Sequence, residues 1–366
     1  MKLQIYSLIT GLLILHTVAF SQQKVSLLFM GDVMGHDGQL AAAYNSQKQT
    51  YEFDTCFSYI APIIRSYDIA IANLEVTLNC TPYKGYPSFS SPASLAAAMV
   101  HAGVTNFVTA NNHSADRGKK GVINTLDALD SIGVISTGTF RNSEERNLLY
   151  PLILEKNGIR IAVLNCTYGL NGLPVPEGTV INLIDTTQIK QDIARAKSVN
   201  AECIIMCIHW GLEYQLSPNA EQISIANFLK KQGVHAVIGS HPHVVQRAEW
   251  DTTNNFFQVF SLGNFISNQR TQPRDGGMMI ALDIEKKNDT VTITNAGYIL
   301  TWVYTPSVDT KKQFYVLPVS QYEQNPDFFD SPVSFSTMNN CMNIIRPVLE
   351  KENIATPEIR FETTTK

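Results

Sequence analysis

The sequence contains few charged residues and no cluster of basic ones. Charged residues make up 16% of the 366 residues, the formal net charge is −4, and the lysines and arginines are scattered along the chain. Proteins that bind nucleic acids or anionic membranes by electrostatics need basic side chains gathered on one surface. We therefore expect no nucleic-acid partner and no polybasic membrane contact.

Cysteine pairs with metal-ligand spacing are also absent. None of the six cysteines forms a C-x-x-C pair, so we do not expect a thiolate zinc site. Cys203 and Cys207 lie in one apolar run, and four residues of extended chain span ~13 Å, which is too far for a disulfide between them. Both are expected to be small core residues. An exported protein could form disulfides among the other four, but the sequence does not pair them.

Two common catalytic motifs are missing as well. The sequence has no serine or cysteine nucleophile elbow and no glycine-rich phosphate loop beside its other candidate residues. A serine hydrolase and a P-loop nucleotide hydrolase are therefore poor explanations for this chain.

Long hydrophobic runs are rare, and the one at the N-terminus has the features of a signal peptide. Residues 1–21 begin with Met1-Lys2, continue through the apolar stretch Leu8–Phe20 and end at Ser21, with small residues, Ala19 and Ser21, at the positions that a signal peptidase reads. The stretch is short and interrupted for a membrane span, and no cysteine follows it to carry a lipid. We expect export to the periplasm or beyond, with no stable membrane span after cleavage. An uncleaved N-terminal anchor is the alternative.

What the chain does contain is ample hydrophobic sequence, 44% of its residues, which suits one large or two modest globular domains. One stretch organises our interpretation. The apolar run 234–238 leads into His241 and His243, two imidazoles at the end of an expected strand that can both point at one ion. Pro242 has no N–H and favours extended backbone before it. The alternative is a pair of histidines in a surface loop.

Four other expected strands end in the same way, with a polar residue directly after an apolar run. These runs are residues 25–30, 68–72, 104–109 and 203–208. The strand-end residues are Asp32, Glu75, Asn112, His113, His209, His241 and His243. Individually, the Asp, Glu and Asn residues could serve turns, solvated loops or helix caps.

Together these residues predict a metal site. Catalytic sites lie at the carboxyl ends of strands in α/β sheets. Carboxylate, amide oxygen and imidazole without thiolate suit one or two ions of Mn, Fe or Zn, and two ions can share a bridging hydroxide and clamp an oxyanion during hydrolysis. Asp116, three residues after His113, could orient that imidazole. The segment 81–92, rich in Pro, Ser and Gly, is expected to be a long loop that could overhang the site.

Alternation of strands and amphipathic stretches predicts an α/β protein. Helices are expected over 56–66, 92–101, 119–132, 187–199, 218–233 and 334–349. A hairpin is expected over 152–164, and antiparallel strands over 278–283 and 291–293. From about Trp302 the strand-end pattern stops. We therefore divide the chain into a signal peptide (1–21), a main domain (24–301) and a C-terminal extension (302–366) that packs on it.

The strand-end residues also stand in motifs that resemble those of the CapA family, the poly-gamma-glutamate capsule synthesis proteins. The motifs are Gly31-Asp32, Asn73-Leu74-Glu75, Asn111-Asn112-His113 with Asp116 and Gly118, His209-Trp210-Gly211 with Glu213-Tyr214, His241-Pro242-His243-Val244, and Ser261-Leu262-Gly263-Asn264-Phe265. They occur in that order across about residues 25 to 300. A complete ordered series is much more specific than any one of its members.

That family is a branch of the calcineurin-like metallophosphoesterases, so the resemblance implies a four-layer αββα sandwich and a binuclear metal centre. It implies that Asp32, Glu75, Asn112, His209, His241 and His243 are metal ligands. It also implies that His113 protonates the leaving group, steadied by Asp116.

Two departures from the wider superfamily bear on the metal centre. The usual D-x-H motif is absent, since Met34 stands where the histidine is expected. The nearest histidine is His36, and the sequence leaves open whether it is a ligand. Glu75 stands where a bridging Asp is expected. Both departures bear on whether two ions are held and whether a phosphoester is cleaved.

Two functional hypotheses follow. In the first, the chain is an exported metallohydrolase that acts on an anionic polymer or phosphoester in capsule or exopolymer biosynthesis, cleaving a phosphoester or a glutamyl amide. In the second, it is a non-catalytic component of a capsule synthesis or export assembly, alongside other capsule synthesis proteins, with a degenerate metal site.

Overall fold

The computed structural model describes residues 23–308 and 310–362. The predicted signal peptide therefore lies outside the described residues. Within them, no helix is both long and apolar enough to cross a membrane.

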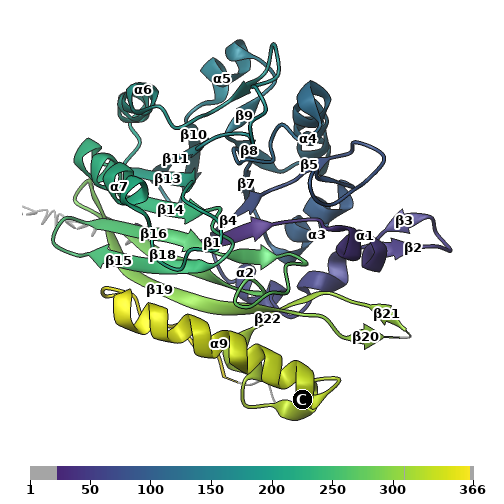
Figure 1. The fold of residues 1–366 in the computed structure, drawn as a ribbon. Coiled ribbons are helices and arrows are strands. Elements are labelled where there is room, and N and C mark those ends of the chain that lie inside the picture. The colour runs from purple at the N-terminus through teal and green to yellow at the C-terminus, as the bar shows by residue number, and fades with distance from the viewer. Residues whose placement is uncertain (1–22, 309, 363–366) are drawn as a thin grey trace, which may run out of the picture.

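Two β-sheets form the centre of the molecule (Figure 1). The first has eight strands in the order β22-β19-β18-β1-β4-β7-β8, with β17 also paired to β1, and the second has six in the order β10-β11-β13-β14-β16-β15. The strands of the first sheet are β1 (Gln23–Val33), β4 (Ile69–Leu74), β7 (Asn106–Val108), β8 (Ile135–Thr137), β17 (Asn264–Ile266), β18 (Gly276–Lys287), β19 (Thr290–Tyr304) and β22 (Tyr315–Pro318). Those of the second are β10 (Leu152–Lys156), β11 (Ile159–Thr167), β13 (Cys203–His209), β14 (Ala236–Ser240), β15 (Val245–Asp251) and β16 (Phe256–Leu262).

The two sheets pack face to face. Side chains alternate between the faces of a strand, so Leu27 and Phe29 of β1 join Ile161 and Val163 of β11 in one buried cluster between the sheets. Leu28 of β1 points the other way, into a second cluster on the outer side of the first sheet. Because these strands are buried on both faces, their sequences are continuous apolar runs in which apolar and polar residues do not alternate.

Helices cover the outer faces of both sheets. On the first sheet lie α2 (Ala61–Ile64), α3 (Ser94–Ala102) and part of α4 (Gly118–Ile132). On the second lie α6 (Thr186–Ser198) and α7 (Ala220–Gln232), which appear together on one side of Figure 1. The α/β class and the four-layer αββα sandwich are therefore confirmed.

The single helix expected over 56–66 is wrong in detail. The structure has a 3₁₀ helix, η1 (Asp54–Phe57), and the short α2, separated by a turn. Pro62 lies at the start of α2, where its missing N–H costs no helical hydrogen bond, whereas inside one helix over 56–66 it would remove such a bond and disfavour the helix. The hairpin is confirmed, since β10 and β11 pair antiparallel.

The remaining elements are short, except for the last helix. They are α1 (Asp37–Ala43), β2 (Tyr44–Asn45), β3 (Thr50–Tyr51), β5 (Thr77–Leu78), β6 (Ser90–Ser91), β9 (Thr139–Phe140), α5 (Ser143–Leu149), β12 (Val180–Ile181), β20 (Ser307–Val308), β21 (Lys311–Lys312), α8 (Val319–Tyr322), η2 (Pro326–Phe328) and α9 (Pro332–Glu352). Helix α9 buries Met342 and Ile345 in the cluster between the sheets. The predicted boundary between residues 301 and 302 falls inside β19, which pairs with β22. The division into domains stays a prediction.

Candidate metal centre

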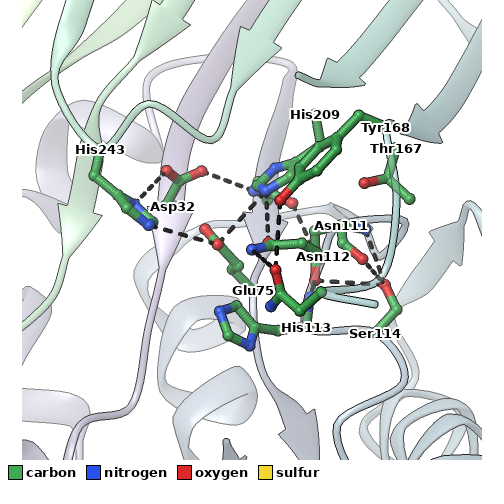
Figure 2. Close-up of polar contacts among 12 residues, drawn as sticks. Asp32, Glu75, Asn111, Asn112, His113, Ser114, Thr167, Tyr168, His209 and His243 are labelled. Carbon is green, nitrogen blue, oxygen red and sulfur yellow. Dashed lines mark hydrogen bonds and ion pairs between the residues drawn. The ribbon is translucent and has the colours of Figure 1, made fainter. Parts of the chain in front are cut away.

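Parallel pairing brings the predicted strand-end residues to one place. Asp32 of β1 is in register with Asn73 of β4, and His209 of β13 is in register with Ser240 of β14. Figure 2 shows side chains from both sheets converging there. We call the seven residues Asp32, Glu75, Asn112, His113, His209, His241 and His243 the strand-end cluster. Each is at most 4% exposed, so none is a surface-loop residue.

Two overlapping sets of ligand atoms lie within this cluster. Asp32, Glu75 and His243 form the first ligand group, and Glu75, His209 and His241 form the second. Within each group one ligand atom of every residue lies within 4.8 Å of the others. Glu75 belongs to both groups, which is the arrangement needed for one carboxylate to bridge two ions.

The carboxylate of Glu75 is the clearest sign that the cluster fits a cation. It is fully buried, yet neither oxygen has a hydrogen-bond partner among the described residues. Its nearest ring nitrogens are Nε2 of His209, 3.5 Å from Oε1, and Nε2 of His243, 3.8 Å from it. Burial, followed by the charge of Asp32, raises the pKa of Glu75 well above its usual range. A buried carboxylate without partners is costly, and a divalent cation would supply what it lacks.

Asp32 and His243 form an ion pair in the first ligand group. Oδ2 of Asp32 lies 3.1 Å from Nδ1 of His243, and Oδ1 accepts a hydrogen bond of 2.8 Å from Nδ2 of Asn73. Burial would lower the pKa of His243, but the carboxylates of Glu75 and Asp32 outweigh it and raise the pKa to about 9. Burial would raise the pKa of Asp32, but its bond to His243 and the nearby imidazoles lower it to about 2. Positive charge is therefore favoured between these carboxylates.

The second ligand group contains two imidazoles that stay neutral. Burial lowers the pKa of His209 to about 3 and that of His241 to about 2. Nε2 of His209 lies 2.9 Å from Oδ1 of Asn112, and Nδ1 of His241 is buried without a partner among the described residues. Neutral imidazole is the form that binds metals. The cluster as a whole therefore fits divalent metal binding, and the structure brings all six predicted ligands together.

The backbone between the two histidines differs from our expectation. His241 and His243 both have positive φ, 102° and 57°, so the prediction that Pro242 would keep His241 extended is wrong. Hydrogen bonds from Trp210 N to Ser240 O and from Tyr214 N to Pro242 O hold this turn. Non-glycine residues in this region are strained, and such strain concentrates at functional sites.

His113 is oriented as predicted but belongs to neither ligand group. Its Nδ1 lies 2.8 Å from Oδ2 of Asp116, and that oxygen also accepts a 2.6 Å hydrogen bond from Phe89 N. Burial would lower the pKa of His113, but Asp116 and the charge of Glu75 raise it. The imidazolium form, a proton donor, is therefore favoured. Phe89 comes from the loop 81–92, and its ring centroid is 4.7 Å from that of His113, so this loop does lie against the site.

Position 34, where the D-x-H histidine is expected, holds a buried methionine. Met34 lies in the outer apolar cluster of the first sheet. His36 precedes α1, and its Nδ1 contacts Oε1 of Gln39 at 3.2 Å and the backbone N of Asn268 at 3.3 Å. His36 is not part of either ligand group formed by the described residues. The first ligand group therefore contains a single imidazole.

Our sequence interpretation assigned no role to several residues that support the ligands. Asn73 donates to Asp32, Oδ1 of Asn264 lies 3.1 Å from Nδ1 of His243, and Asn111 donates to Leu74 O at 2.8 Å. The ring of Tyr168 stacks near His209, as Figure 2 shows. Asn73 and Asn111 follow the runs 68–72 and 104–109, so the rule that found the ligands could have found these two. Asn264 is the first residue of β17, where that rule does not apply.

Comparison with known proteins identifies the family. Residues 26–269 match the family described as bacterial capsule synthesis protein PGA_cap. The chain belongs to this family.

Two curated relatives of the PGA_cap chain carry the CapA name. It is 26% identical over 272 residues to the capsule biosynthesis protein CapA of Bacillus anthracis, covering 70% of this chain and 63% of that protein. It is 27% identical over 270 residues to the PGA biosynthesis protein CapA of Bacillus subtilis strain 168, covering 71% and 68%. The match thus spans less than two thirds of the B. anthracis relative.

Among solved structures, the chain resembles the calcineurin-like phosphoesterase YfkN of Bacillus subtilis, with a TM-score of 0.47 and 14% identity over 89% of this chain and 100% of that one. It also resembles the NAD nucleotidase NadN of Haemophilus influenzae, with a TM-score of 0.44 and 10% identity over 92% and 57%.

Proposed function

We propose that this PGA_cap chain is an exported metal-dependent hydrolase that acts on an anionic polymer or phosphoester in capsule or exopolymer biosynthesis. The observation that carries the proposal is the pair of ligand groups joined at Glu75, whose buried carboxylate oxygens have no hydrogen-bond partner among the described residues. Two divalent ions of Mn, Fe or Zn fit this donor set. The bond cleaved is a phosphoester or a glutamyl amide, since both pass through an oxyanion that cations stabilise.

The side chains divide the work between holding metal and moving a proton. Asp32, Glu75 and His243 would hold one ion, and Glu75, Asn112, His209 and His241 the other. When bound, such ions polarise the scissile group and lower the pKa of water. His113 supplies the proton to the leaving group from Nε2, because Nδ1 is engaged by Asp116, 2.8 Å away.

The proposal is tested by turnover with metal supplied. The full chain is assayed on 4-nitrophenyl phosphate and on a gamma-glutamyl 4-nitroanilide, with Mn, Fe and Zn in turn, and its metal content is measured. We expect His113→Ala to keep the metal and to lower turnover by roughly 10²–10⁴-fold, the usual contribution of a positioned acid. Asp116→Asn should act in the same direction more weakly. Loss of metal in His113→Ala would show that this residue is a ligand instead.

One observation favours the second hypothesis, a non-catalytic component of a capsule synthesis assembly. Buried Met34 replaces an imidazole, leaving the first ligand group with one histidine. If intact protein binds no transition metal and cleaves neither substrate, this hypothesis replaces the first.

A further inference from the structure

An arginine lies at the edge of the strand-end cluster. Arg274 is half-buried, and its Cζ lies 3.4 Å from the centroid of the Tyr214 ring. The Tyr214 centroid in turn lies 6.1 Å from the centroid of the His243 ring. An edge-on guanidinium would place Cζ farther from the ring, so the planar group must face it. The stack covers one face of the guanidinium and leaves its in-plane N–H groups clear of the ring.

Both members of this stack are tied to the turn formed by residues 241–243, which we call the histidine turn. The side-chain amide of Asn264 donates to Arg274 O at 2.8 Å, and its Oδ1 lies 3.1 Å from Nδ1 of His243. Tyr214 N donates to Pro242 O at 2.8 Å. The guanidinium is therefore fixed relative to the first ligand group rather than carried on a free loop.

Arg274 also differs from Arg270, four residues earlier, in whether its charge has an internal counter-ion. Nη2 of Arg270 lies 3.4 Å from Oδ2 of Asp275, and that oxygen accepts a hydrogen bond from Trp302, so Arg270 has an internal partner. Arg274 has no ion pair with a carboxylate of residues 23–308 or 310–362, Glu213 beside Tyr214 included. An oriented cation thus remains without a counter-ion next to the site.

We propose that Arg274 and Tyr214 form a subsite for a second oxyanion of the substrate, a carboxylate or a phosphate, beside the bond that is cleaved. Arginine presents paired N–H groups in the geometry that both anions accept, and stacking on tyrosine holds that fork in place. This inference rests on the proposed function, because it takes the strand-end cluster as the place where the bond is cleaved.

Calorimetric titration of the metal-supplied full chain tests the subsite without requiring turnover. The titrants are tri-gamma-glutamate with free α-carboxylates, the same peptide with α-carboxamides, and inorganic tripolyphosphate. Arg274→Gln should weaken binding of the free carboxylate peptide or of tripolyphosphate by roughly 10- to 100-fold. Whichever of the two weakens identifies the anion, and the carboxamide peptide should be unaffected by the change.

Two further variants keep the test interpretable. Arg160→Gln is the matched control. Arg160 pairs with Glu155 near the start of β11, which is the end of that strand away from the site. The Arg160→Gln variant should therefore bind both anions like wild type. Arg274→Lys keeps the charge but loses the planar fork, so its affinity for the anion should lie between those of wild type and Arg274→Gln. It also serves as the comparison if Arg274→Gln does not fold.

The outcomes separate this inference from the proposed function. If Arg274→Gln, or Arg274→Lys in its place, binds both anions as tightly as wild type, the subsite is refuted, even if the protein hydrolyses substrate. If anion binding depends on Arg274 but intact protein with metal cleaves neither chromogenic substrate, the subsite stands and the proposed hydrolase does not.

Discussion

The two ligand groups differ although they share Glu75. The first has two carboxylates and one imidazole, and its His243 is driven towards the charged form by Glu75 and Asp32. The second has one carboxylate and two imidazoles that burial keeps neutral, with Asn112 beside His209. The imidazoles of the second group are therefore already in the form that binds metal, whereas an ion in the first group must also displace a proton from His243. We expect the second group to bind metal more tightly.

The largest effect is expected from the residue that both groups share. Glu75→Gln should abolish stoichiometric binding at both positions, because it removes the bridging charge. The same change should not destabilise the metal-free protein, since it removes a buried carboxylate whose oxygens accept no hydrogen bond from the described residues. Metal analysis and denaturant unfolding in the presence of chelator measure the two effects. Retention of two equivalents of metal would contradict the shared role.

Separate changes in the two groups should reveal their difference. His241→Ala should remove the more tightly held ion, and His243→Ala the weaker one, with little loss of fold in either because the core is formed by apolar strands. Stepwise dialysis against chelator, followed by elemental analysis, resolves the two. If both variants keep the wild-type metal content, these histidines are not ligands.

A core cysteine provides the contrast outside the site. Cys203 lies in β13, six residues before His209, and is 1% exposed in the cluster between the sheets. Cys203→Ala should leave metal content unchanged and lower the free energy of unfolding by about 1 kcal/mol. A lower metal content at unchanged stability would place this residue in the site.

Much of the fold and of the cluster could be predicted from the sequence, for a physical reason. Parallel strands buried on both faces need continuous apolar runs, and their carboxyl ends share one edge, so the residue after each run marks the site. Asp32, Glu75 and His209 were found in this way. The six cysteines, for which the sequence offered no pairing, are all buried and free.

Other features depend on contacts that a sequence does not show. The positive φ of His241 arises because tertiary hydrogen bonds override the local preference set by Pro242. The sharing of Glu75 between the two groups needs distances between strands of different sheets. The stack of Arg274 on Tyr214 joins residues 60 positions apart through Asn264 and the histidine turn, and no local pattern indicates it.

The central claim is that the strand-end cluster holds two ions joined by Glu75. Anomalous diffraction from crystals of the full chain grown with Mn²⁺ tests it most directly. We predict two anomalous peaks flanking the Glu75 carboxylate, one next to Asp32 and His243 and the other next to His209 and His241. A single peak beside His209 and His241 would contradict the binuclear centre and leave only the second group as a metal site. The absence of any peak at Glu75 would contradict the account altogether.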